Sequence, residues 1–152
     1  MSPDAKEEIE LQFRLLENLV ESFRPLINKV AEADPNLVET AALGSVLQSF
    51  YNGVESIFQR IAKDVEGSAP IGDAWHSQLL QGAARAGPRR PAVISEGLRR
   101  HLRDYLEFRH VFRATYTILL RWDRMAHLVT GLDDTLHQLQ AEVHAFLAAQ
   151  PD

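Results

Sequence analysis

The chain has 152 residues, enough for one domain with a buried core, and its 45% apolar and 24% charged residues are typical of a folded soluble protein. It contains no cysteine, which excludes disulfide scaffolds, cysteine-bound zinc and thiol catalysis. Its acidic start lacks the pattern of a signal peptide, and no apolar run approaches the roughly 20 residues that span a bilayer. We therefore expect residues 1–152 to form a single cytoplasmic domain without a membrane segment.

The formal net charge of −5 conceals an uneven distribution. Residues 85–124 carry ten arginines, no lysine and four acidic residues, a net charge of +6, so the rest of the chain carries −11. The planar guanidinium group of arginine suits bidentate contact with phosphate or carboxylate, which would fit an RNA-binding surface. An ordinary solvated helix face with internal ion pairs fits the same pattern.

Apolar residues recur at helical spacing from the start of the chain. Residues 4–33 are predicted to form one long amphipathic helix, which Pro25 kinks or splits. Asp34-Pro35-Asn36 is a stop-and-restart signal, because proline suits the first turn of a following helix. The second helix is expected to run to about Val65.

Glycines mark the next features of the chain. Gly44 and Gly53 slightly weaken the second helix and favour close approach of a neighbouring helix. Residues 66–72 read as a loop, after which Asp73 is expected to cap a short helix. Residues 82–91, with two glycines, two prolines and three arginines, form a second break.

The last third of the chain contains two further long helical patterns. Ser95 is predicted to cap a helix whose body runs from Glu96 to Leu119, Trp122-Asp123 resembles a corner, and a final helix begins at Asp133. Nowhere does the sequence alternate in the manner of a strand. We predict an all-α fold, an antiparallel bundle of four to five main helices.

Two side chains of the helix after Ser95 suggest chemistry. Its apolar residues fall on one broad face: Leu98, Leu102, Tyr105, Phe108, Phe112, Tyr116 and Leu119. Arg103 and His110 are seven residues apart, close to two full turns, so they lie one above the other on a stripe roughly opposite that face. We therefore expect both side chains to be exposed.

An exposed arginine and histidine suit phosphodiester cleavage. Histidine can act as acid or base near neutral pH, and arginine can hold the phosphate and stabilise the negative charge of the transition state. RNA supplies its own 2′-hydroxyl nucleophile, so no metal is required. Two such pairs facing each other across a two-fold axis would make a better site, and the small Ala114 on the stripe leaves room for close approach.

The same stripe also fits an ordinary helix surface. Glu107 is spaced to pair with both Arg103 and His110, which is common on exposed helices. Arg121 and His127 have a similar spacing, but a corner is expected between them at residues 122–123, so we do not expect them to share one helix face.

Three segments of the sequence resemble the HepT-like branch of the HEPN superfamily, and the likeness covers nearly the whole chain. They are Phe50-Tyr51-Asn52-Gly53-Val54-Glu55, Trp75-His76-Ser77-Gln78-Leu79-Leu80 and Leu102-Arg103-Asp104-Tyr105-Leu106-Glu107-Phe108-Arg109-His110-Val111-Phe112. The family signature is an arginine, usually followed by a polar residue, then a histidine after four to six intervening positions. Arg103-Asp104 and His110 fit this signature at its upper limit, with six residues between.

The resemblance implies an HEPN-like helical fold and a metal-independent endoribonuclease that uses no cofactor. Such a protein is the toxin of a toxin–antitoxin pair, with a composite active site formed across a homodimer. His110 would be the general acid or base, Arg103 the phosphate and transition-state ligand, and Asp104 a supporting polar group.

The partner implied by the resemblance is a minimal nucleotidyltransferase antitoxin, which in some pairs AMPylates a tyrosine two residues after the histidine. That position is Phe112 here, and Tyr105 and Tyr116 are the nearest alternatives, both expected on the core face. A second hypothesis is a non-catalytic interaction module, in which the stripe docks a nucleotidyltransferase or senses nucleotides.

Overall fold

The computed structural model describes residues 1–151, and over this range it is helical with no strand. The prediction of an all-α bundle is confirmed. The α-helices are α1 (Pro3–Ser22), α2 (Arg24–Val30), α3 (Leu37–Ile61), α4 (Trp75–Ala83), α5 (Glu96–Ala114), α6 (Trp122–Thr130) and α7 (Leu132–Ala149). A π-helical segment, η1 (Ala62–Glu66), extends α3, and a 3-10 turn, η2 (Thr117–Leu119), lies between α5 and α6.

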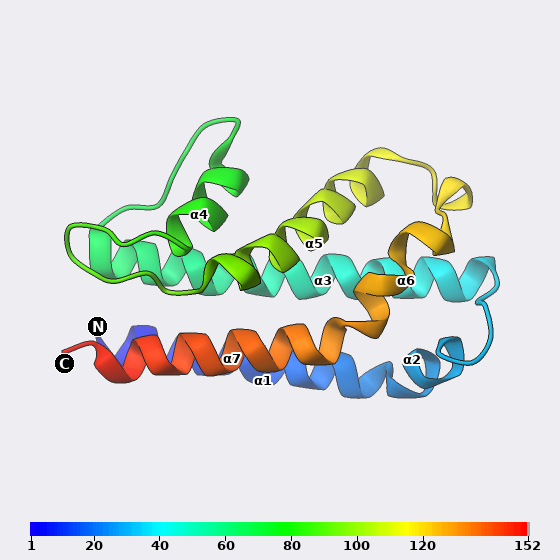
Figure 1. Ribbon diagram of the computed structural model, residues 1–152, viewed down its shortest axis with the longest axis horizontal. Helices are drawn as coiled ribbons and strands as arrows, with labels where there is room; N and C mark the ends of the chain where they lie inside the picture. The colour runs from blue at the N-terminus through cyan, green and yellow to red at the C-terminus, as the bar shows by residue number, and fades with distance from the viewer. Residues whose placement is uncertain (152) are drawn as a thin grey trace.

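Helix α3 lies at the centre of the bundle (Figure 1). Helices α1 and α7 pack together along one side of it, and α4 and α5 pack along the other. The two ends of the chain meet, because the N-terminal amino group donates a hydrogen bond to the Pro151 carbonyl at 2.7 Å. This arrangement leaves one face of α4 and one face of α5 open to solvent beside each other.

Most helix boundaries follow the expected signals. The first helical stretch is split at Phe23, two residues before Pro25. Ser95 caps α5, where its hydroxyl accepts a hydrogen bond from the Leu98 amide. The expectation for Asp73 is wrong, because α4 follows Ala74 and no side chain caps it.

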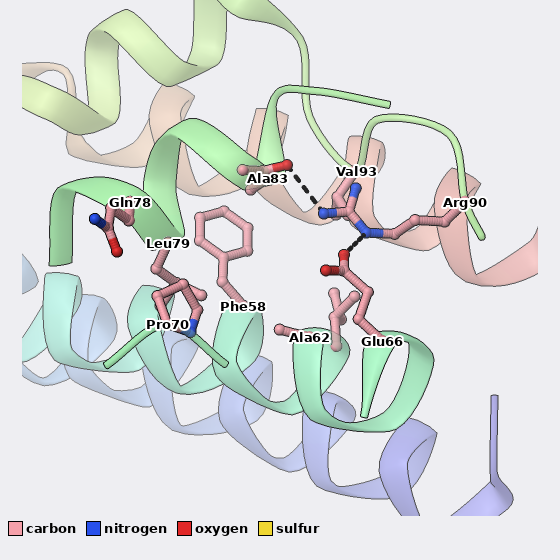
Figure 2. Close-up of a pocket in the computed structure, with 11 residues that line it drawn as sticks. Phe58, Ala62, Glu66, Pro70, Gln78, Leu79, Ala83, Arg90 and Val93 are labelled. Carbon is pink, nitrogen blue, oxygen red and sulfur yellow. Dashed lines mark hydrogen bonds and ion pairs between the residues drawn. The ribbon is translucent and has the colours of Figure 1, made fainter. Parts of the chain in front are cut away.

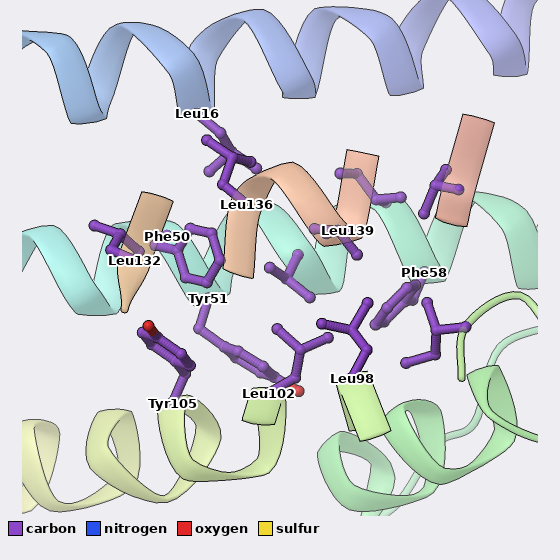
Figure 3. Packing of buried hydrophobic residues seen from close by; sticks show 14 of the residues in the cluster. Leu16, Phe50, Tyr51, Phe58, Leu98, Leu102, Tyr105, Leu132, Leu136 and Leu139 are labelled. Carbon is purple, nitrogen blue, oxygen red and sulfur yellow. The ribbon is translucent and has the colours of Figure 1, made fainter. Parts of the chain in front are cut away.

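The core is formed by inward faces of α1, α3, α5 and α7 (Figure 3). The predicted close approaches to the glycines of α3 are confirmed. A Cβ atom on Gly53 would lie 2.6 Å from Leu16 Cδ2 of α1, and one on Gly44 would lie 2.6 Å from Phe112 Cε1 of α5. Both glycines therefore allow a neighbouring helix to pack closely against α3.

The predicted extent of α5 is wrong at its C-terminus. The helix ends at Ala114, and Thr115 and Tyr116 are extended before the 3-10 turn. Residues 115–118 are β-branched or aromatic, types that lose side-chain freedom in a helix. Tyr116 and Leu119 are consequently exposed to solvent and do not belong to the core face.

Candidate functional site

Arg103 and His110 lie on the exposed face of α5, as the helical spacing predicts. The Arg103 side chain is 62% exposed, and its Nε donates a hydrogen bond to Glu107 at 3.0 Å. Both Arg103 and His110 line one groove, which lies between α5 and the start of α4. His76 and Ser77 line the same groove from the α4 side.

Asp104 does not line this groove. It borders the hollows between α5, α6 and α7, which also contain His127. Arg121 lines the first of these hollows too, so the corner does not separate Arg121 from His127 as expected. Arg121 is the residue before α6 and forms an ion pair with Asp123 at 2.9 Å.

Arg109 is the site residue that the sequence reasoning missed. Its side chain is only 4% exposed, and Nη1 donates hydrogen bonds to Glu55 Oε1 at 2.6 Å and to Asn52 Oδ1 at 2.9 Å. Its guanidinium carbon lies 4.9 Å from the centre of the Tyr51 ring. Burial, with a smaller contribution from the charge of Glu55, raises the pKa of Tyr51 although Arg109 opposes it. Arg109 is thus a buried ion-pair partner rather than a free phosphate ligand.

His76 joins this buried network to the groove. Its Nδ1 lies 2.6 Å from Glu55 Oε2 and 2.9 Å from Arg109 Nη2, while its side chain remains 31% exposed. The Trp75 ring lies against it, with 3.6 Å between the ring centres. His76 is therefore held in a fixed orientation at the groove wall.

A sequence signal for the network did exist. Arg109 falls four residues after Tyr105, within the apolar face of α5, and Glu55 falls among the buried residues of α3. Opposite charges inside the apolar faces of two helices favour a buried pair between them, because an unpaired buried charge is costly.

Arg90 also turns inward, as Figure 2 shows. Its Nε donates a hydrogen bond to Glu66 at 2.5 Å, and its remaining nitrogens donate to the carbonyls of Gly82, Arg85 and Pro91 at 3.0 Å each. This arginine fixes the loop between α4 and α5. Part of the positive segment is therefore structural. Five other arginines of this segment are exposed and have no ion pair within residues 1–151: Arg85, Arg89, Arg100, Arg113 and Arg124.

The candidate tyrosines differ in access. Tyr105 is buried as expected, its hydroxyl donates a hydrogen bond to the Leu128 carbonyl at 2.6 Å, and burial raises its pKa to about 12. Tyr116 is 78% exposed. Of these two, only Tyr116 is accessible to a modifying partner in this conformation.

Within residues 1–151, no group of three or more histidine, aspartate or glutamate side chains is placed to hold a metal ion. In the same range, every helix is too short or too polar to cross a membrane.

A protein family described as "HepT-like protein" matches residues 42–150 of the chain. The match extends from α3 to α7 and includes every residue of the groove and of the buried network. No curated protein and no solved structure gives a match.

Proposed function

Because the chain belongs to the HepT-like family, we propose that it is a metal-independent endoribonuclease acting as the toxin of a toxin–antitoxin pair. The observation that carries the proposal is the shared groove of Arg103 and His110, an arginine that can bind phosphate beside a histidine that can transfer a proton. Both side chains are exposed, so an RNA strand can reach them.

The groove residues suit cleavage by the 2′-hydroxyl of the substrate. That oxygen attacks phosphorus, the bond to the 5′-oxygen breaks, and the products are a 2′,3′-cyclic phosphate and a 5′-hydroxyl. Arg103 stabilises the charge on the phosphate oxygens, and His110 transfers a proton. Arg103 must exchange Glu107 for phosphate, which costs little because exposed ion pairs contribute about 0–1 kcal/mol.

A homodimer with a composite site is part of the proposal. Apolar side chains are exposed at the C-terminal end of α5 and in η2, namely Val111, Ile118 and Leu119, and Val111 also lines the groove. Such a patch favours association with a second copy. Asp104 faces away from the groove of its own protomer and would support catalysis only from across this interface.

A minimal nucleotidyltransferase is the proposed antitoxin. Tyr116 is the tyrosine that such a partner could AMPylate, since its ring is exposed whereas that of Tyr105 is buried. A modified Tyr116 would lie near the end of α5 that carries His110, where an added negative charge would repel RNA.

Cleavage of RNA by purified protein in EDTA tests the proposal. We expect cyclic phosphate ends, and we expect His110→Ala and Arg103→Ala to abolish cutting while helicity is unchanged. His101→Ala is the matched control, because His101 is an exposed histidine of the same helix outside the groove. Light scattering should give the mass of a dimer.

The Arg103–Glu107 pair is the one observation that favours the second hypothesis, an interaction module whose stripe is an ordinary charged surface. If wild type and His110→Ala are equally inert at every concentration, the nuclease proposal is wrong and the module remains.

A further inference from the structure

Cleavage by a 2′-hydroxyl requires two proton transfers, and the groove contains two histidines. One proton must leave the attacking 2′-oxygen, and one must reach the departing 5′-oxygen. His110 lies on the α5 wall of the groove and His76 on the α4 wall. This inference rests on the proposed function and concerns which residue accepts the first proton.

The surroundings of His76 fix its orientation. Glu55 Oε2 lies 2.6 Å from Nδ1, so when Nδ1 carries the ring proton the carboxylate accepts it and the lone pair is on Nε2. In that tautomer the 2.9 Å contact of Arg109 Nη2 with Nδ1 is not a hydrogen bond, because both groups are donors. Nε2 has no hydrogen-bond partner within residues 1–151, and His76 lines the groove. The Trp75 ring, tilted by 31° against the imidazole, further restricts rotation. A carboxylate that orients an imidazole in this way is a recurrent device in catalytic sites.

The charges around His76 come from three elements. Glu55 of α3 and Arg109 of α5 contact Nδ1, and together they carry no net charge. Asp73 precedes α4 at the groove, and Arg103, Glu107 and His110 line it from α5. A cation and both histidines therefore surround one space that a phosphodiester can enter.

We propose that His76 is a second catalytic residue, the general base of RNA cleavage. Its Nε2 accepts the proton of the 2′-hydroxyl as that oxygen bonds to phosphorus. The bond from phosphorus to the 5′-oxygen breaks, and His110 donates its proton to that oxygen. Exchange with water then returns His76 to the neutral form and His110 to the protonated form.

The decisive comparison uses two substrates. One is an RNA oligonucleotide, and the other is a set of nucleoside 3′-(4-nitrophenyl phosphates), whose leaving group needs no acid. His76→Asn removes the base and keeps an N–H donor for Glu55. We expect it to lower the rate on both substrates by about 10²–10⁴-fold. We expect His110→Ala to be impaired on RNA and to recover most of its rate on the nitrophenyl esters.

The pH profiles provide a second readout. Loss of a general base removes the fall in rate at low pH, and loss of a general acid removes the fall at high pH. Added imidazole should partly restore His76→Ala. Gln78→Ala is the matched control, because Gln78 is an exposed residue of α4 outside this groove.

The outcomes separate this inference from the proposed function. If the wild type cuts RNA and His110→Ala does not, but His76→Asn has a normal rate and pH profile, His76 is not the base and the nuclease proposal stands. His76 has a merely structural role if His76→Asn is slow but keeps the wild-type pH profile and imidazole does not rescue His76→Ala. A wild type that is inert in EDTA overturns both proposals.

Discussion

Replacing Arg109 by methionine tests whether two arginines of one helix have different roles. The Arg109–Glu55 pair is 2.6 Å long, and its side chains are only 4% and 7% exposed. Removing one partner of a buried pair costs about 3–5 kcal/mol, because the other charge is left without compensation. His76 contacts the second oxygen of Glu55, and a protonated His76 can replace part of the lost charge. We therefore expect Arg109→Met to lower the free energy of unfolding by about 3 kcal/mol, at the lower end of the range for a broken buried pair.

Arg103→Met is the matched control for this experiment. The Arg103–Glu107 pair is of similar length but has both side chains more than half exposed, so its loss should cost less than about 1 kcal/mol. Urea denaturation followed by circular dichroism measures both values. Adding Glu55→Gln to Arg109→Met should recover part of the loss, since no unpaired charge remains. Equal stabilities of the two single variants would refute the assignment of Arg109 as a buried structural residue.

Two further predictions concern stability. Gly53→Ala should destabilise the fold by about 1 kcal/mol, because the cost of overpacking against buried Leu16 exceeds the gain in helix propensity. Gly44→Ala, whose new methyl group meets the outer edge of the half-buried Phe112 ring, should leave the stability nearly unchanged in the same urea denaturation experiment. If Gly44→Ala were the more destabilising of the two variants, the packing described would be contradicted. Two hydrogen bonds from Ser2, of which the backbone one is the larger cause, lower the pKa of Asp64. A lowered native pKa stabilises the fold above the unfolded pKa of about 3.9 and is lost as the pH falls through the native value. Asp64→Asn should therefore lose stability near neutral pH and show a weaker decline in acid, and an unchanged acid profile would argue against this contact.

Much of the fold could be predicted from the sequence because its signals are local. Ser95 lies directly before an amphipathic helix, and Pro25 interrupts another. The end of α5 could not be predicted so well, because no glycine or proline lies between Ala114 and Gly131. There the helix is ended by a run of weak helix formers, a signal that tertiary packing often overrides.

The candidate site could be predicted only in part. The exposure of Arg103 and His110 follows from helical spacing, since both lie opposite the apolar face of α5. The position of His76 in the groove does not follow from helical spacing, because contacts between residues far apart in the sequence bring α4 beside α5. The burial of Arg109 depends likewise on Glu55, which lies 54 residues earlier in the chain. Spacing along one helix cannot report a partner on another.

The most direct measurement is single-turnover cleavage of a labelled RNA in a chelator, with wild type, His110→Ala and His101→Ala compared at equal helical content. The account predicts cyclic phosphate termini from wild type and His101→Ala and intact RNA with His110→Ala. Cutting that persists at the wild-type rate in His110→Ala would contradict it, since the groove between α4 and α5 would then not be where the RNA is cleaved.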